Sequence, residues 1–93
     1  MYYDFVFHVP TAFTPNDDGD NDQFGPQGLR MEEYQSYEFT IFNRWGDRIF
    51  ETTDINDWWD GAGHQHGSYS WAIVILDELG ALRKEVGEVL LIR

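Results

Sequence analysis

The chain has 93 residues and a mass of 10.9 kDa, a size that suits one domain with one hydrophobic core. Its 42% hydrophobic and 17% aromatic residues exclude a disordered tail. With 17 acidic and 6 basic residues the net charge is −11, which disfavours nucleic acids and membrane surfaces as partners because both are anionic. The sequence holds no cysteine, which excludes disulfides, thiolate metal sites and a cysteine nucleophile.

The front of the chain carries no recognisable targeting signal. The opening MYYDFVFHVP lacks the basic region of a leader, and the longest apolar run, residues 71–76, is far shorter than the roughly 20 residues of a membrane helix. If the domain is exported, we expect either a leader on a larger parent chain or export information within the domain itself.

The first segment with strand character is residues 3–9. Large side chains alternate along it and Pro10 ends it, which predicts a strand at the edge or end of a sheet. Residues 14–28 follow as a loop rich in proline, glycine and aspartate. Only a short extended piece near Phe24 could pair with any other segment in that stretch.

The middle of the chain predicts a β-hairpin. Apolar and polar residues alternate over residues 37–43 and again over 48–53, and both runs are rich in aromatic or β-branched side chains. Residues 44–47 between them have the composition of a turn, in which Gly46 is free to adopt positive φ.

A second loop over residues 54–67 precedes two further predicted strands. Residues 68–76 are apolar on both faces and predict the most buried strand, whereas residues 81–92 form the last one after a turn at 77–80. Residues 29–35 offer only one possible helical turn. The predicted class is all-β, an antiparallel Ig-like β-sandwich of about seven short strands with under about 10% helix, and an open barrel is the alternative.

The acidic segment NDDGDND, residues 16–22, is the sharpest local signal for a metal. Asn16, Asp18, Asp20 and Asp22 place oxygen ligands at alternate positions around a glycine, which is a pattern that can wrap calcium. The spacing differs from an EF-hand, since the glycine comes one step early and no glutamate follows at the twelfth position. The alternative is a solvated turn in which Asp and Asn bond their own backbone.

The segment WWDG with two nearby histidines is a weaker signal. His64 and His66 near Asp60 could hold zinc, and Trp58 or Trp59 could stack on sugars, but neither pattern is specific. The alternative is that the histidines lie on the surface while one tryptophan packs inward and the other caps a sheet edge. Asp60 could likewise close a turn or reach the acidic loop as a distal ligand.

No catalytic motif is found in the sequence. It contains no G-x-S-x-G elbow, no H-E-x-x-H and no phosphate-binding loop, and with 17 acids in 93 residues chance proximity accounts for carboxylate pairs. A domain of this size also has little room for a substrate cleft. We therefore expect no enzyme activity.

Several spaced motifs together resemble a known family. These motifs are VPTAFTPN from residue 9, DG and ND within 18–22, IFNRWG from 41, WDG from 59, GSY from 67 and the closing LIR. They resemble the gliding-motility-associated C-terminal domain family, also called the type B sorting domain of the type IX secretion system of the Bacteroidota. The resemblance runs from about Phe7 to Arg93. Asp17 stands where small residues are common, and the stretch between Gly61 and Gly67 is shorter than in many relatives.

The resemblance implies that residues 1–93 form a single C-terminal sorting domain, the last piece of a larger parent protein. Such a domain would direct an N-terminal cargo in the same chain across the outer membrane, through the periplasm to the cell surface or the medium. The implied partner is an outer-membrane component of the machinery, PorP/SprF-like. The alternative function is a calcium-stabilised adhesion or carbohydrate-binding module, which binding to glycans would reveal.

Three residues are predicted to bind the partner: Arg44, Trp45 and Trp58. Arginine and aromatic side chains are the favoured anchors of protein interfaces. The alternative for the first two is structural, with Trp45 packed onto the sandwich and Arg44 paired with an acid of the 16–22 loop. We expect Asn43 and Gly46 to serve the turn.

Overall fold

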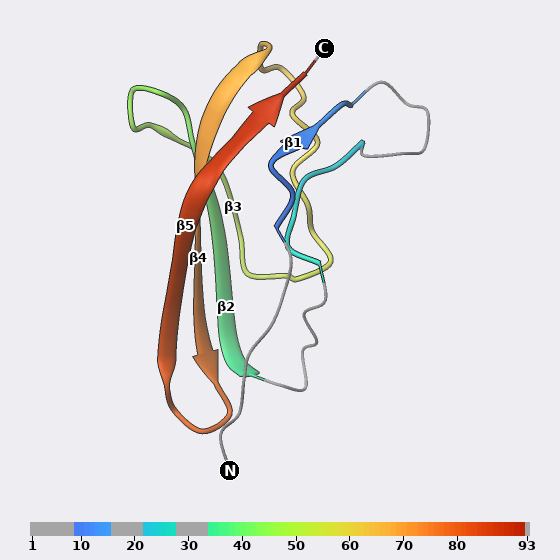
Figure 1. Ribbon diagram of the computed structural model, residues 1–93. Coiled ribbons are helices and arrows are strands. Elements are labelled where there is room, and N and C mark those ends of the chain that lie inside the picture. The colour runs from blue at the N-terminus through green and yellow to red at the C-terminus, as the bar shows by residue number, and fades with distance from the viewer. Residues whose placement is uncertain (1–8, 16–21, 28–33, 93) are drawn as a thin grey trace.

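The computed structural model describes residues 9–15, 22–27 and 34–92, and these contain five strands and no helix. The strands are β1 (Ala12–Phe13), β2 (Tyr34–Phe42), β3 (Arg48–Thr52), β4 (Gly67–Asp77) and β5 (Leu82–Leu91) (Figure 1). Within this described part, no helix is long and apolar enough to cross a membrane.

The strands form one sheet in the order β1-β5-β4-β2-β3. Two hairpins, β2–β3 and β4–β5, lie side by side through the antiparallel pairing of β2 with β4, and β1 adds to β5 in parallel. The β2–β3 hairpin and its turn confirm the sequence prediction, because alternation and turn residues are local signals.

The all-β class is confirmed, but the antiparallel Ig-like sandwich of about seven strands is not. The described residues form a single mixed sheet of five strands. The layer that covers one face of this sheet contains irregular chain around Phe24 and Trp59, and these two residues form an isolated antiparallel bridge. The strand predicted over residues 3–9 and most of the helical turn predicted over 29–35 lie outside the described residues.

The covered face of the sheet holds the core. On β4 the side chains of Trp71, Ile73 and Ile75 are buried, whereas the alternate residues Ala72 and Val74 are half-buried on the opposite face. The prediction that this strand is apolar on both faces is correct, and its central place in the sheet explains why. On the open face of β5, Leu82, Val86 and Leu90 are exposed.

Aromatic side chains join the irregular layer to the sheet. Phe24 N–H donates to the Trp59 carbonyl at 2.7 Å, and Trp59 N–H donates to the Phe24 carbonyl at 2.9 Å. The Phe13 ring lies 5.4 Å from Trp59 and 5.8 Å from Phe24, and Phe24 lies 5.8 Å from Phe39 of β2. These rings are almost fully buried, so they form the contact between the irregular layer and the sheet. Figure 1 shows the segments of this layer beside β1, on one side of the sheet.

Candidate functional site

The turn between β2 and β3, residues 43–47, is built by Asn43 and is named the tip. The Asn43 side-chain oxygen accepts hydrogen bonds from the backbone N–H of Trp45 at 2.9 Å and of Asp47 at 3.0 Å. Gly46 N–H donates to the Asn43 carbonyl at 3.0 Å, and Gly46 has a φ of 84°, which favours glycine. Asn43 and Gly46 therefore serve the turn, as predicted, and fix the backbone that carries Arg44 and Trp45.

The side chains of Arg44 and Trp45 project from this turn. Trp45 is 73% exposed, and the Arg44 guanidinium carbon lies 4.6 Å from the centroid of the Trp45 ring. Trp45 therefore does not pack into the core. Arg44 takes part in neither salt bridge found among the described residues, which are Arg48 with Glu51 and Arg83 with Asp77. Its observed contact is a cation–π interaction with its neighbour.

A second loop, residues 60–66, faces the tip. Asp60 carboxylate accepts a hydrogen bond from Ala62 N–H at 2.9 Å, and His64 N–H donates to the Gly61 carbonyl at 3.1 Å. Asp60 thus closes a turn, which is one of the two roles proposed for it. Gly61 is buried with a φ of 71°, and a Cβ there would lie 3.1 Å from Leu91, so the loop bends against the core where only glycine fits.

Three packed rings hold this loop in place. The Trp59 ring, 3% exposed, lies 5.1 Å from Tyr69 of β4 and 5.7 Å from His64, and the latter two rings are 6.1 Å apart. Tyr69 hydroxyl donates to the Gln65 carbonyl at 2.7 Å. The loop is therefore fixed by a core tryptophan beneath it and by a strand residue beside it.

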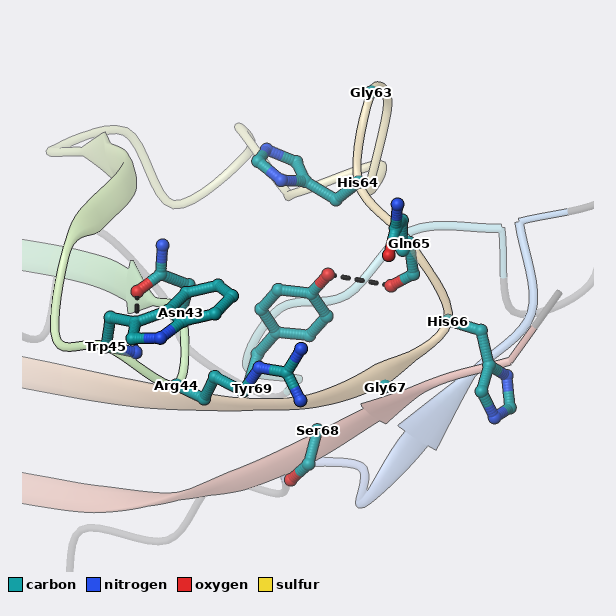
Figure 2. A pocket seen from close by; sticks show the side chains of 10 residues that line it. All are labelled: Asn43, Arg44, Trp45, Gly63, His64, Gln65, His66, Gly67, Ser68 and Tyr69. Carbon is teal, nitrogen blue, oxygen red and sulfur yellow. Dashed lines mark hydrogen bonds between the residues drawn. The ribbon is translucent and has the colours of Figure 1, made fainter.

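Between the tip and the loop lies a cleft of about 340 Å³ (Figure 2). Its lining comes from the tip, from the loop and from the start of β4, and consists of Asn43, Arg44, Trp45, Gly63, His64, Gln65, His66, Gly67, Ser68 and Tyr69. In Figure 2 the Trp45 and Tyr69 rings stand on either side, with Arg44 reaching from the tip toward Tyr69. The cleft offers aromatic surface, donors from a cationic group and backbone groups of a glycine-rich loop.

The structure separates the three predicted partner-binding residues. Arg44 and Trp45 line the cleft, but Trp58 does not. Trp58 is half-buried, its indole N–H donates to the Ile55 carbonyl at 3.0 Å, and its ring lies so close to Gly25 that a Cβ there would be 2.5 Å from it. These contacts give Trp58 a packing role, while its neighbour Trp59 faces the core.

The wall formed by residues 64–69 was missed as a functional surface by the sequence analysis. In the sequence, Gly67 and Tyr69 stand out only as part of a family motif, and the histidines only as a weak metal signal. The tip and this wall are more than 15 residues apart along the chain, and the pairing of β2 with β4, which sets Phe42 opposite Ser70, brings them together. To predict that the tip and this wall lie together, one would have to know the order of the strands in the sheet.

The predicted calcium ligands Asn16, Asp18 and Asp20 lie outside the described residues, and Asp22 is described and half-buried. Among the residues the structure describes, no group of three or more His, Cys, Asp or Glu side chains is arranged to hold a metal ion. Calcium binding by residues 16–22 therefore stays a prediction.

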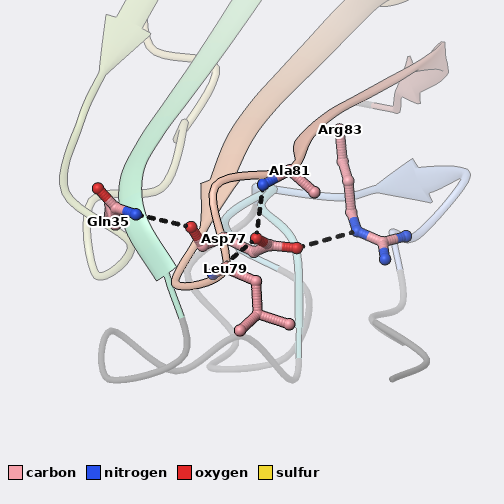
Figure 3. A network of polar contacts seen from close by, with 5 residues as sticks. All are labelled: Gln35, Asp77, Leu79, Ala81 and Arg83. Carbon is pink, nitrogen blue, oxygen red and sulfur yellow. Dashed lines mark hydrogen bonds and ion pairs between the residues drawn. The ribbon is translucent and has the colours of Figure 1, made fainter. Parts of the chain in front are cut away.

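A separate polar network lies at the far end of β4, away from the cleft (Figure 3). The buried Asp77 carboxylate accepts hydrogen bonds from Leu79 N–H at 2.9 Å and Ala81 N–H at 2.8 Å, and it lies 3.7 Å from Arg83 Nε. Gln35 side-chain amide donates to the Asp77 carbonyl at 3.2 Å. A buried carboxylate needs such partners, so this network stabilises the β4–β5 turn.

One buried titratable group also lies apart from the cleft. Burial raises the pKa of the Tyr37 phenol above its ordinary value, and Tyr34 with the Asp54 and Asp57 carboxylates raises it further. Its hydroxyl is buried and forms no hydrogen bond within the described chain. Tyr37 therefore stays neutral at physiological pH and belongs to the core.

The tip thus presents an exposed tryptophan and an exposed arginine beside a cleft, and both residue types are enriched among the anchors of protein interfaces. Residues 7–89 match the type IX secretion signal domain family, CHU_C, and the chain belongs to this family. The match confirms the resemblance found from the motifs. A comparison with curated proteins finds no match. The family is one of secretion signals and not of enzymes, and its role implies a cargo in the same chain and export across the outer membrane.

Proposed function

We propose that the secretion machinery recognises this domain in its folded form, through the tip and the adjoining cleft. The observation that carries the proposal is Trp45, which is 73% exposed and held by an ordered turn, in a chain of a secretion signal family. Tryptophan and arginine are the residue types most enriched among the anchors of protein interfaces. An ordered tip also loses little conformational freedom when a partner binds it.

The partner in this proposal is an outer-membrane component of the type IX machinery, PorP/SprF-like. The domain forms the C-terminal piece of a larger parent, whose cargo precedes it in the chain. Cargo and domain pass through the periplasm and reach the cell surface or the medium. A partner that selects a folded module among many periplasmic proteins needs a distinctive surface feature, and the tip is such a feature.

Residues 1–93, fused to the C-terminus of a periplasmically directed fluorescent protein, are expected to carry that protein across the outer membrane of a host with a type IX system. The measurement is the fraction of fluorescence outside the cells or on their surface after fractionation. The same fusion in a host without the system, and the cargo without the domain, are the controls and should stay in the periplasm.

The proposal is contradicted if this fusion stays in the periplasm while an established sorting domain exports the same cargo in the same host. The adhesion or carbohydrate-binding module then becomes the better interpretation. Binding of the purified domain to a glycan array would support that alternative.

We also infer that the loop containing Asn16, Asp18, Asp20 and Asp22 binds calcium, because clustered carboxylates repel one another without a cation. Calcium at about ten times its Kd is expected to stabilise the fold by about 1.4 kcal/mol and to raise Tm by roughly 5–10 °C. Differential scanning calorimetry of chelator-treated protein measures this, and magnesium should do less. Changing Asp18 and Asp22 together to Asn should remove the shift.

The matched control for that experiment changes Glu85 and Glu88 of β5 to Gln. Both residues are exposed, so this variant removes the same charge and leaves the sequence of the loop unchanged. It should keep the calcium-dependent rise in Tm. If the unmodified domain shows no binding heat and no change in Tm at millimolar calcium, the loop is an ordinary Asx-rich turn.

A further inference from the structure

The cleft has a charge character opposite to that of the whole chain. Acidic residues number 17 of 93 in the sequence, yet none is among the ten described residues that line the cleft, although the Asp47 carboxylate lies 3.4 Å from the side-chain amide of Asn43. The same lining includes Arg44, one of only 6 Lys and Arg residues in the sequence. The cleft is therefore a local region suited to an anionic group on an otherwise acidic domain.

Arg44 is the donor that such a group would meet. Within residues 9–15, 22–27 and 34–92, Arg44 takes part in no salt bridge, whereas Arg48 and Arg83 each face a carboxylate. The Arg44 guanidinium carbon lies over the Trp45 ring, 4.6 Å from its centroid, and a guanidinium carries five N–H donors in a planar fork. That fork matches the two oxygens of a carboxylate.

The rings around Arg44 suit the apolar part of an acidic side chain. Trp45 and Tyr69 stand on either side of the cleft, and Tyr69 is held in place by its hydrogen bond to the Gln65 carbonyl (Figure 2). A volume of about 340 Å³ accommodates one or two side chains and not a folded element. One face of the Trp45 ring is covered by the guanidinium, which leaves less flat aromatic surface for a sugar.

We propose that the cleft binds a glutamate or aspartate side chain on an acidic segment of the partner protein, with Arg44 as the bidentate donor. The inference rests on the proposed function for the identity of that partner, and it adds the chemistry by which the partner is recognised. The net charge of −11 opposes an acidic segment at long range, but at physiological ionic strength this repulsion is screened beyond about 8 Å. Recognition is therefore a short-range event that depends on the geometry of Arg44.

The test is an NMR titration of the ¹⁵N-labelled domain with the peptide acetyl-Gly-Glu-Phe-Glu-Gly-amide. The Trp45 indole N–H and Arg44 Nε–H resonances are expected to shift saturably, with a Kd on the order of 1 mM. The isosteric peptide with Gln in place of both Glu should bind about fivefold more weakly or worse, because it lacks the charge. Arg44→Lys should weaken binding of the Glu peptide by a similar factor, since an ammonium cannot form the bidentate pair.

Arg48→Lys is the matched control, because Arg48 lies on β3 beside the same turn but faces Glu51. It should bind the Glu peptide like the unmodified domain. The inference is overturned if no saturable shift occurs at about 10 mM peptide. It is also overturned if the Gln peptide or free glucuronate binds as tightly as the Glu peptide, or if Arg44→Lys has no effect.

This titration contains no secretion machinery, so its outcome is independent of export. A domain that binds the Glu peptide but fails to export its cargo contradicts the proposed function and leaves the chemistry of the cleft standing. A domain that exports its cargo but ignores the peptide contradicts only the inference about the cleft.

Discussion

Replacing Trp59 by alanine is expected to remove most of the stability of this domain. Trp59 is 3% exposed, packs on Phe13 and forms both backbone hydrogen bonds with Phe24. Removing a buried tryptophan side chain costs about 3–5 kcal/mol through lost burial and the cavity left behind. Domains of this size have about 5–10 kcal/mol in total, so the variant should melt about 15–30 °C lower.

Thermal unfolding followed by circular dichroism measures this effect, and Trp58→Ala is the matched control. Trp58 is half-buried and packs over Gly25 at the edge of the same layer, so its loss should cost less than half as much. If the two variants melt at the same temperature, Trp59 is not the residue that holds the irregular layer to the sheet.

The hairpin with the tip could be predicted because its signals are local. Alternating side chains define the two strands, and Asn43 with Gly46 defines the turn between them. Arg44 and Trp45 could therefore be selected as candidate anchors from the sequence. Their exposure could not be predicted, because either side chain could also have folded back onto the sheet.

The covering layer could not be predicted because its contacts join distant parts of the chain. The sequence allows a short extended piece near Phe24 to pair, but it does not indicate that the partner is Trp59, to which Phe24 is joined by two backbone hydrogen bonds. Likewise β1 is only two residues long and pairs in parallel with β5, which alternation alone does not reveal. Counting periodic segments therefore led to a sandwich of about seven strands, where the described chain has one sheet and an irregular layer.

The adjacent residues Trp58 and Trp59 are a second case in which contacts between distant parts of the chain could not be predicted from the sequence. The expectation that one of the two packs inward is confirmed, but the sequence does not say which. The choice depends on Gly25, which has no side chain and leaves room for the Trp58 ring. The cleft is a further case, since its second wall at residues 64–69 is placed by the pairing of β2 with β4.

Changing Arg44 and Trp45 together to alanine is expected to reduce export of a fused cargo by about tenfold or more, with Tm changed by less than about 4 °C. Interface anchors of these types contribute about 2 kcal/mol or more each to binding, so their joint loss removes most of the recognition energy. Stability should be spared because both side chains are exposed and the turn is held by Asn43 and Gly46. The measurements are cargo fractionation in a host with the type IX system and thermal unfolding of the purified domain.

The control is the double change of Leu82 and Val86 to alanine on the open face of β5. These residues are 71% and 65% exposed, so the variant also loses exposed apolar surface, but outside the tip and the cleft. It should export cargo like the unmodified domain. Equal loss of export in both variants would mean that the machinery responds to general surface hydrophobicity. A fall in Tm for the Arg44 and Trp45 variant as large as that for Trp59→Ala would instead make the tip part of the folding core, and recognition would then have to be assigned to another surface.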